Sequence, residues 1–129
     1  MKNIKIIATG SYLPQNKVDN NTIANKLKIT EEFIYKRTGI QTRYYSKDET
    51  IEEIAINSVQ NLIEKNSQID ISKVDMIIVA TTSTNSLMPG ISYKIQEHFD
   101  IKNCMCLDIL AGCSGFINAM DIARNYIAV

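Results

Sequence analysis

The chain has 129 residues, enough for one domain that buries roughly two thirds of the surface of its unfolded state. Hydrophobic residues make up 45% and charged residues 22%, which are ordinary values for a globular domain. Fourteen basic residues balance fourteen acidic ones, so the composition provides no electrostatic attraction to nucleic acid or to an anionic membrane. No apolar run approaches the roughly 20 residues that a membrane-spanning helix needs.

The cysteine and histidine content argues against disulfides and metal sites. Three cysteines are an odd number without the spacing of a disulfide framework, which favours a reducing cytoplasm. Cys104 and Cys106 are two residues apart, which predicts packing on one face of a strand and differs from the C-x-x-C spacing of zinc or redox sites. Because His98 is the only histidine, we expect no metal site built on histidine clusters.

The first half of the chain predicts one strand followed by three helices. Residues 2–8 are rich in isoleucine and predict the strand. Asn20 or Asn21 can cap a short helix, and Thr30 can cap a second helix that ends at Gly39. A third and longer helix carries its apolar residues at helical spacing: Ile51, Ile54, Ala55, Val59, Leu62 and Ile63.

The second half alternates strands with helices. Residues 41–47 lack a clear period, so no element is predicted there. Residues 76–80 and 104–109 are apolar runs of strand length, and the first is typical of a central parallel strand. Pro89 suits the first position of an intervening helix, and a last helix runs from Phe116 to the end of the chain. This order predicts an α/β fold with right-handed crossovers and an at least partly parallel sheet.

The turn between the last strand and the last helix consists of small residues, Ala-Gly-Cys-Ser-Gly at 111–115. Small residues permit a sharp turn from strand to helix. Cys113 would then lie near a helix N-terminus, where uncapped N–H groups favour the nucleophilic thiolate. The pattern therefore predicts covalent catalysis by Cys113. The alternative is a buried cysteine that packs as a small hydrophobe, and the pattern alone leaves both interpretations open.

Four short blocks together resemble the β-ketoacyl-acyl-carrier-protein synthase III family, which has the thiolase-like fold. The blocks are residues 9–14 (TGSYLP), 37–43 (RTGIQTR), 78–83 (IVATTS) extending to Pro89, and 111–116 (AGCSGF). Each block is weak alone, whereas their order and spacing are specific and cover the whole chain. The resemblance implies an α/β, thiolase-like fold in which residues 1–129 form the N-terminal portion, with a mostly parallel mixed sheet flanked by helices.

The resemblance also implies functions for four residues. Cys113 would be the catalytic nucleophile that accepts the acyl group, with its backbone N–H contributing to an oxyanion hole. Phe33 and Arg37 would flank the adenine end of coenzyme A, and the family typically has Trp where this chain has Phe33. Met88 would reach across a dimer interface to line the partner's acyl pocket.

Other interpretations of these binding residues also fit the residue pattern. Phe33 could be a core side chain, and Arg37 could complement the C-terminal end of its helix or pair with an acidic neighbour. Met88 could be a loop residue that fills a gap.

The activity implied by the resemblance is the initiation of fatty-acid synthesis. An acyl group would pass from acyl-CoA to Cys113 and then be condensed with malonyl-acyl-carrier protein, releasing carbon dioxide. We expect a cytoplasmic homodimer that uses a coenzyme A thioester as substrate and needs no cofactor or metal. Neither nucleic acid nor a membrane is expected as a partner.

The chain departs from the family in length. Family members carry a catalytic His and Asn in their second half, and no motif here matches them, so we expect a truncated chain that does not complete condensation alone. The alternatives are another thiolase-like acyltransferase, such as a hydroxymethylglutaryl-CoA synthase or a secondary-metabolite ketosynthase, and a non-catalytic fragment that only binds or dimerises.

Overall fold

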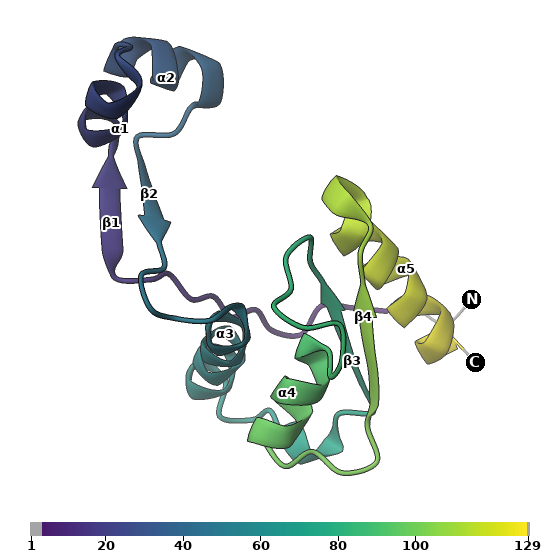
Figure 1. The fold of residues 1–129 in the computed structure, drawn as a ribbon. Helices are drawn as coiled ribbons and strands as arrows, with labels where there is room; N and C mark the ends of the chain where they lie inside the picture. The colour runs from purple at the N-terminus through teal and green to yellow at the C-terminus, as the bar shows by residue number, and fades with distance from the viewer. Residues whose placement is uncertain (1–3, 129) are drawn as a thin grey trace. The chain divides into compact units, whose positions relative to one another are not determined.

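A computed structural model describes residues 4–128, which form two compact units (Figure 1). One unit comprises residues 13–50, and the other comprises residues 4–12 together with residues 51–128. Each unit contains helices and one pair of strands, so the predicted α/β class is confirmed. Among the described residues the strands form two separate pairs, one antiparallel and one parallel.

The unit of residues 13–50 consists of two short helices and an antiparallel strand pair. Its elements are β1 (Asn16–Asp19), α1 (Asn20–Leu27), α2 (Glu31–Thr38) and β2 (Thr42–Tyr45). Neither strand was predicted, because both are only four residues long and neither shows an apolar period. The strands become recognisable only through their pairing. Asn16 lies opposite Tyr45, although α1 and α2 separate the two strands in the sequence.

The two helices of this unit begin at local side-chain caps. The Thr30 hydroxyl accepts a hydrogen bond from the Phe33 N–H at 3.1 Å, and Gly39 ends the helix at φ +69°, so both predicted boundaries of α2 are confirmed. The predicted cap of α1 at Asn20 or Asn21 was wrong. Asp19 is the cap, because its carboxylate accepts the Thr22 N–H at 2.8 Å.

Asn20 has a different function, which explains the misplaced cap. Its side chain is buried and donates to the Ile40 carbonyl at 2.8 Å. Its amide oxygen accepts a hydrogen bond from the Arg43 guanidinium, also at 2.8 Å. Asn20 therefore connects the start of α1 to the segment that leads into β2.

The second unit contains the parallel strand pair. Its elements are α3 (Ile51–Lys65), a 3-10 turn (Ile71–Lys73), β3 (Met76–Ala80), α4 (Ile91–His98), β4 (Met105–Ile109), a second 3-10 turn (Gly112–Ser114) and α5 (Gly115–Ala128). Met76 lies opposite Met105, and Ala80 lies opposite Ile109. The predicted helix–strand–helix–strand–helix order is confirmed, and both strands leave their carboxyl ends at one edge of the sheet.

Two boundary predictions in this unit were wrong. Residues 4–8 form no strand, because no described segment pairs with them, while residues 2 and 3 lie outside the described part. Helix α4 begins at Ile91 with Gly90 as its N-cap, so Pro89 precedes the helix.

Helix α4 carries buried apolar side chains, and α5 does not. Ile91 and Ile95 of α4 are at most 5% exposed, and so is Ile101 in the segment that follows the helix. By contrast, α5 leaves large apolar side chains at the surface: Phe116, Ile117, Tyr126 and Ile127.

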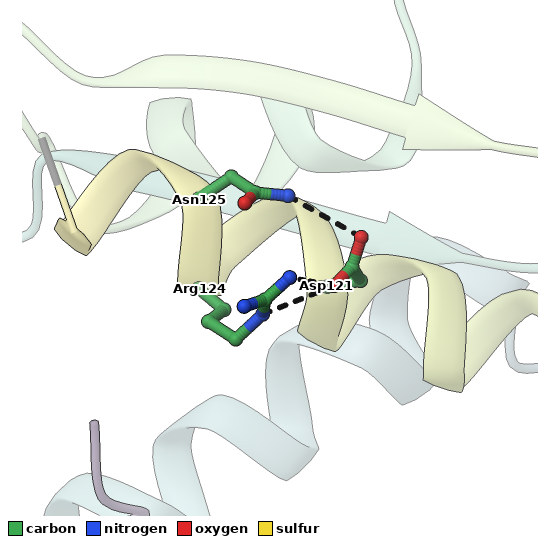
Figure 2. A network of polar contacts seen from close by, with 3 residues as sticks. All are labelled: Asp121, Arg124 and Asn125. Carbon is green, nitrogen blue, oxygen red and sulfur yellow. Dashed lines mark hydrogen bonds and ion pairs between the residues drawn. The ribbon is translucent and has the colours of Figure 1, made fainter. Parts of the chain in front are cut away.

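The polar side chains of α5 form their own network. Asp121 accepts hydrogen bonds from Arg124 at 2.7 and 3.0 Å and from Asn125 at 3.3 Å (Figure 2). No helix within residues 4–128 combines the length and the apolar character that crossing a membrane requires.

Candidate active site at the turn before the last helix

A single 3-10 turn joins β4 to α5 and carries Cys113 at its middle position. Both the backbone N–H of Ser114 and its hydroxyl donate to the Ala111 carbonyl, at 3.3 and 2.8 Å. Gly112 has φ +55°, a left-handed conformation that favours glycine. The predicted sharp turn from strand to helix is therefore confirmed.

The helix after the turn begins in contact with the sheet. Gly115 is buried, and a Cβ at this position would lie 3.2 Å from the Cβ of Ala80 on β3. A larger side chain would push the start of α5 away from the sheet. Small residues are thus needed here for packing as well as for the turn itself.

The three thiols have different surroundings. Cys113 is exposed, whereas Cys104 and Cys106 are half-buried. Burial raises the pKa of both the Cys104 and the Cys106 thiol, and the Cys106 sulfur donates to the Ser92 carbonyl on α4 at 3.6 Å. Since Cys113 is exposed in its unit, the interpretation as a buried small hydrophobe does not describe it. Its function as the nucleophile stays a prediction.

An open apolar groove of about 1260 Å³ begins at Cys113. One wall is a single face of β3, formed by Met76, Ile78 and Ala80. The other wall is one side of α5, which includes Phe116, Ala119, Met120, Ala123, Tyr126 and Ile127. A thiol at the end of an apolar groove suits the transfer of an acyl chain, because apolar walls bind the chain while the sulfur forms the thioester.

Phe33 and Arg37 lie one turn apart on α2, and the guanidinium carbon is 5.4 Å from the centre of the Phe33 ring. This is a cation–π arrangement. Phe33 is 51% exposed, so it is not a core residue of its unit, and Arg37 forms no ion pair within residues 4–128. The two residues belong to the unit of residues 13–50, and the prediction that they lie beside the mouth of a tunnel to Cys113 stays a prediction.

Met88 lies in the loop of residues 81–90, which follows β3 and leads into α4. It is 85% exposed, and the neighbouring Leu87 is 88% exposed. The Ser86 hydroxyl donates to the Met88 carbonyl at 2.8 Å. Met88 thus follows a strand whose carboxyl end is next to that of β4. Its predicted contact with a partner's acyl pocket stays a prediction.

His98 and the acidic residues form no further centre in the described chain. His98 is exposed at the end of α4 and lies edge-on to Phe99, with ring centres 4.8 Å apart. Residues 4–128 contain no group of three or more His, Cys, Asp and Glu side chains placed to hold a metal ion.

One residue of the site escaped the sequence analysis. Asp108 on β4 accepts backbone hydrogen bonds from the start of α4, at Ile91 and Ser92. The available signal was a single carboxylate within the apolar run of residues 104–109. A charged residue within an apolar strand requires a partner, although the sequence does not identify which one.

The chain is similar to β-ketoacyl-acyl-carrier-protein synthases III. The synthase of Clostridium botulinum strain 657 is 40% identical over 123 residues, and that of the Wolbachia from Brugia malayi is 41% identical over 123 residues. Each match covers 95% of this chain and 37% of the relative. The chain thus spans little more than a third of the length of these curated relatives. No family model matches the chain.

Solved structures agree with this similarity. The 3-oxoacyl-acyl-carrier-protein synthase III of Aquifex aeolicus has a TM-score of 0.88 at 35% identity, covering 96% of this chain and 40% of that one. The priming β-ketosynthase of the R1128 polyketide pathway has a TM-score of 0.85 at 30% identity, covering 92% of this chain and 36% of that one. The resemblance to the synthase III family and the thiolase-like fold of this part are confirmed.

Proposed function

We propose that this chain is the acyl-accepting part of a β-ketoacyl-acyl-carrier-protein synthase III that initiates fatty-acid synthesis. The observation that carries the proposal is an exposed Cys113 on a glycine-containing turn, at the end of an apolar groove. The names of the similar synthases support it.

In the proposed first step, the Cys113 thiolate attacks the carbonyl carbon of acyl-CoA. A carbon–sulfur bond forms to Cys113, the bond to the coenzyme A sulfur breaks, and that thiolate leaves and takes up a proton. The backbone N–H of Cys113 contributes to stabilising the oxyanion of the tetrahedral intermediate. The acyl chain then lies along the groove between β3 and α5.

In the proposed second step, the acyl group is condensed with malonyl-acyl-carrier protein. Loss of carbon dioxide from the malonyl thioester produces an enolate carbon that attacks the acyl-Cys113 carbonyl and releases the Cys113 thiolate. The catalytic His and Asn expected for this step have no counterpart in the 129 residues, which are little more than a third of the similar synthases' length. Condensation is therefore proposed for the longer enzyme, and this chain contributes the acylation step.

Phe33, Arg37 and Met88 are the proposed substrate contacts. Phe33 and Arg37 bind the adenine end of coenzyme A, since an exposed ring with a cation over it offers a stacking surface and a positive charge. Met88 contributes to the acyl pocket of a homodimer partner. Coenzyme A is a substrate here, and no resident cofactor is proposed. The exposed thiol of Cys113 is compatible with a cytoplasmic location, where thiols stay reduced.

The acylation step can be tested with the 129-residue chain and acetyl-CoA, measured by intact mass. We expect a partial acetyl adduct that is absent in Cys113→Ala. No β-ketoacyl product should form at an ordinary enzymatic rate with malonyl-acyl-carrier protein, since loss of even one oxyanion donor costs on the order of 10²–10³ in rate. An adduct that persists in Cys113→Ala would contradict the assignment, and efficient condensation would contradict the proposal that this chain is only a part.

The coenzyme A contacts have a matched control on the same helix. Arg37→Ala should raise the acetyl-CoA concentration needed for half-maximal acylation, because it removes the cation over Phe33. Lys36→Ala removes an adjacent cation that pairs with Glu32, and it should leave this concentration unchanged. Equal effects of the two substitutions would indicate a nonspecific charge effect and would remove Arg37 from the site.

The priming ketosynthase at 30% identity favours a second candidate, a secondary-metabolite ketosynthase with another starter group. A panel of acyl-CoA donors of increasing chain length separates the two candidates. Preference for the shortest donors supports initiation of fatty-acid synthesis, whereas preference for longer or branched donors supports the second candidate. Absence of any adduct, with a dimer in native mass spectrometry, would indicate a fragment that only dimerises.

A further inference from the structure

We infer that Asp108 is a positioning residue that holds together the turn of Cys113 and the loop of Met88. The significance of Asp108 for catalysis rests on the proposed function of Cys113. The contacts of Asp108 are observed independently of that function. The Asp108 side chain projects from β4 to the N-terminus of α4, where Oδ2 accepts the Ile91 N–H at 2.5 Å and Oδ1 accepts the Ser92 N–H at 2.9 Å. Each carboxylate oxygen therefore has its own backbone donor.

An ionised carboxylate is the group that suits these two donors. It presents two acceptor oxygens and no donor, so both N–H groups are satisfied by charge-assisted hydrogen bonds. An amide would place an NH₂ group opposite one of the N–H groups. The negative charge also complements the positive end of the α4 dipole. Helix α4 has no side-chain cap from its own N-cap residue, so Asp108 provides the capping interaction from the neighbouring strand.

Gly90 provides a second, independent observation. Its backbone has φ −70° and ψ 170°, an extended conformation that any residue adopts, so the turn itself does not require glycine. A Cβ at this position, however, would lie 2.2 Å from Oδ2 of Asp108 and 2.7 Å from its carboxyl carbon. Glycine at position 90 thus leaves the space that the Asp108 carboxylate occupies.

These contacts connect two segments of the candidate site. The loop of residues 81–90 leaves the carboxyl end of β3 and ends at Gly90, two residues after Met88. The turn of Cys113 leaves the carboxyl end of the parallel strand β4, five residues after Asp108. The Thr81 N–H donates to the Ile109 carbonyl at 3.2 Å, which joins the two strand ends. Asp108 joins the far end of the loop to the same strand.

The experiment uses the 129-residue chain with Asp108→Asn, Gly90→Ala and Asp121→Asn. Asp121 is the matched control, because its carboxylate accepts hydrogen bonds within α5, from Arg124 and Asn125 (Figure 2). Two quantities are measured in folded protein: hydrogen exchange of the Ile91 and Ser92 amides, and the absolute iodoacetamide labelling rate of Cys113. Cys106 is not used as the reference, because its thiol contacts the Ser92 carbonyl at the capped end of α4. Neither measurement uses acyl-CoA, so both can still be interpreted if the proposed acylation does not occur.

We expect Asp108→Asn and Gly90→Ala to accelerate exchange of the two amides about ten- to hundredfold, the factor for losing a hydrogen bond to a charged acceptor. The labelling rate of Cys113 itself should fall by about fivefold, the factor for one ordinary hydrogen bond, because the turn loses its fixed position. Asp121→Asn should change neither quantity. Loss of stability alone would instead raise the labelling of the half-buried Cys104 and Cys106 without lowering that of the exposed Cys113, so a slower rate at Cys113 separates positioning from loss of stability.

A double variant keeps the test informative if a single variant is destabilised. In the Asp108→Ala background, Gly90→Ala no longer meets a carboxylate and should add less than twofold to either change. Additive effects of the two substitutions, or unchanged Cys113 labelling while amide exchange accelerates, would overturn the inference. In the latter case Asp108 would be only a helix cap.

Discussion

Helices α4 and α5 both follow a strand of the same parallel pair, and they differ in what covers them. α4 lies against α3 and both strands, and three of its residues are buried, Ile91, Ser92 and Ile95. α5 packs mainly on β3, and Gly115 is its only buried residue within the described chain. A helix with apolar residues on several sides is typical of one covered by more protein. Apolar spacing therefore predicted both helices equally well, while burial depended on the neighbours.

The largest expected difference concerns isoleucines on the two helices. Ile91 is 2% exposed and Ile117 is 67% exposed. Ile91→Ala should lower the free energy of unfolding by about 2–5 kcal/mol, because it leaves a cavity among packed neighbours. Ile117→Ala should lower it by less than about 0.5 kcal/mol, since an exposed side chain loses little on truncation. Urea unfolding followed by circular dichroism measures both.

A milder substitution keeps this comparison measurable if the alanine variant does not fold. If Ile91→Ala does not fold, Ile91→Val should still cost about 0.5–1.5 kcal/mol, with Ile117→Val as its control. Equal costs at positions 91 and 117 would mean that α5 is covered in solution, for example by self-association through its exposed apolar side chains. Sedimentation over a range of concentrations would detect such association.

The thiols next to the two helices should differ in reactivity. Cys106 contacts α4 through the Ser92 carbonyl, whereas Cys113 is exposed at the start of α5. Iodoacetamide should label Cys113 faster by on the order of tenfold or more, because the thiolate reacts and burial raises the pKa of the Cys104 and Cys106 thiols. Peptide mass mapping at short times measures the ratio, and preferential labelling of Cys104 or Cys106 would contradict the assignment.

A smaller loss of stability is expected at a helix cap that comes from an adjacent residue, in contrast to the cap of α4, which comes from Asp108 on β4. Thr30 caps α2 from the preceding position, so Thr30→Ala should destabilise that helix by about 1 kcal/mol. Faster exchange of the Phe33 amide would register the loss. The cost should be confined to the unit of residues 13–50, with Ile91 and Ser92 unaffected, and a change at those two amides would break the distinction between local and remote caps.

The smallest expected effect is a pH dependence at the cap of α1. The hydrogen bond from the Thr22 N–H lowers the pKa of Asp19 below its ordinary value of 3.8. Because the folded-state pKa is the lower one, the stabilisation is present above the ordinary value and is lost as the pH falls through the folded-state pKa. Carboxyl NMR shifts should show the low titration, and protection of the Thr22 amide, measured against its intrinsic exchange rate at the same pH, should fall at acid pH. A titration at or above 3.8 would contradict the assignment.

Local patterns in the sequence identified the helices, strands and turns that are determined by residues close together in the chain. Apolar periodicity located α3, and a continuous apolar run located the strand β3. The Thr30 hydroxyl and Gly39 marked the ends of α2, and small residues predicted the turn of Cys113. The four family-like blocks indicated the fold that the similar synthases share. These features depend on the backbone preferences and side chains of adjacent residues, which a single sequence displays directly.

Tertiary structure decided what depends on residues far apart in the chain. Strands β1 and β2 have no apolar period, and they form because they pair with each other although α1 and α2 separate them in the sequence. Residues 4–8 have a strand-like sequence, but no described segment pairs with them. The start of α4 is set by Asp108, a carboxylate that follows it by more than a dozen residues. Pairing, capping across the fold and burial all require a partner in space, and the local sequence does not say which partner will be there.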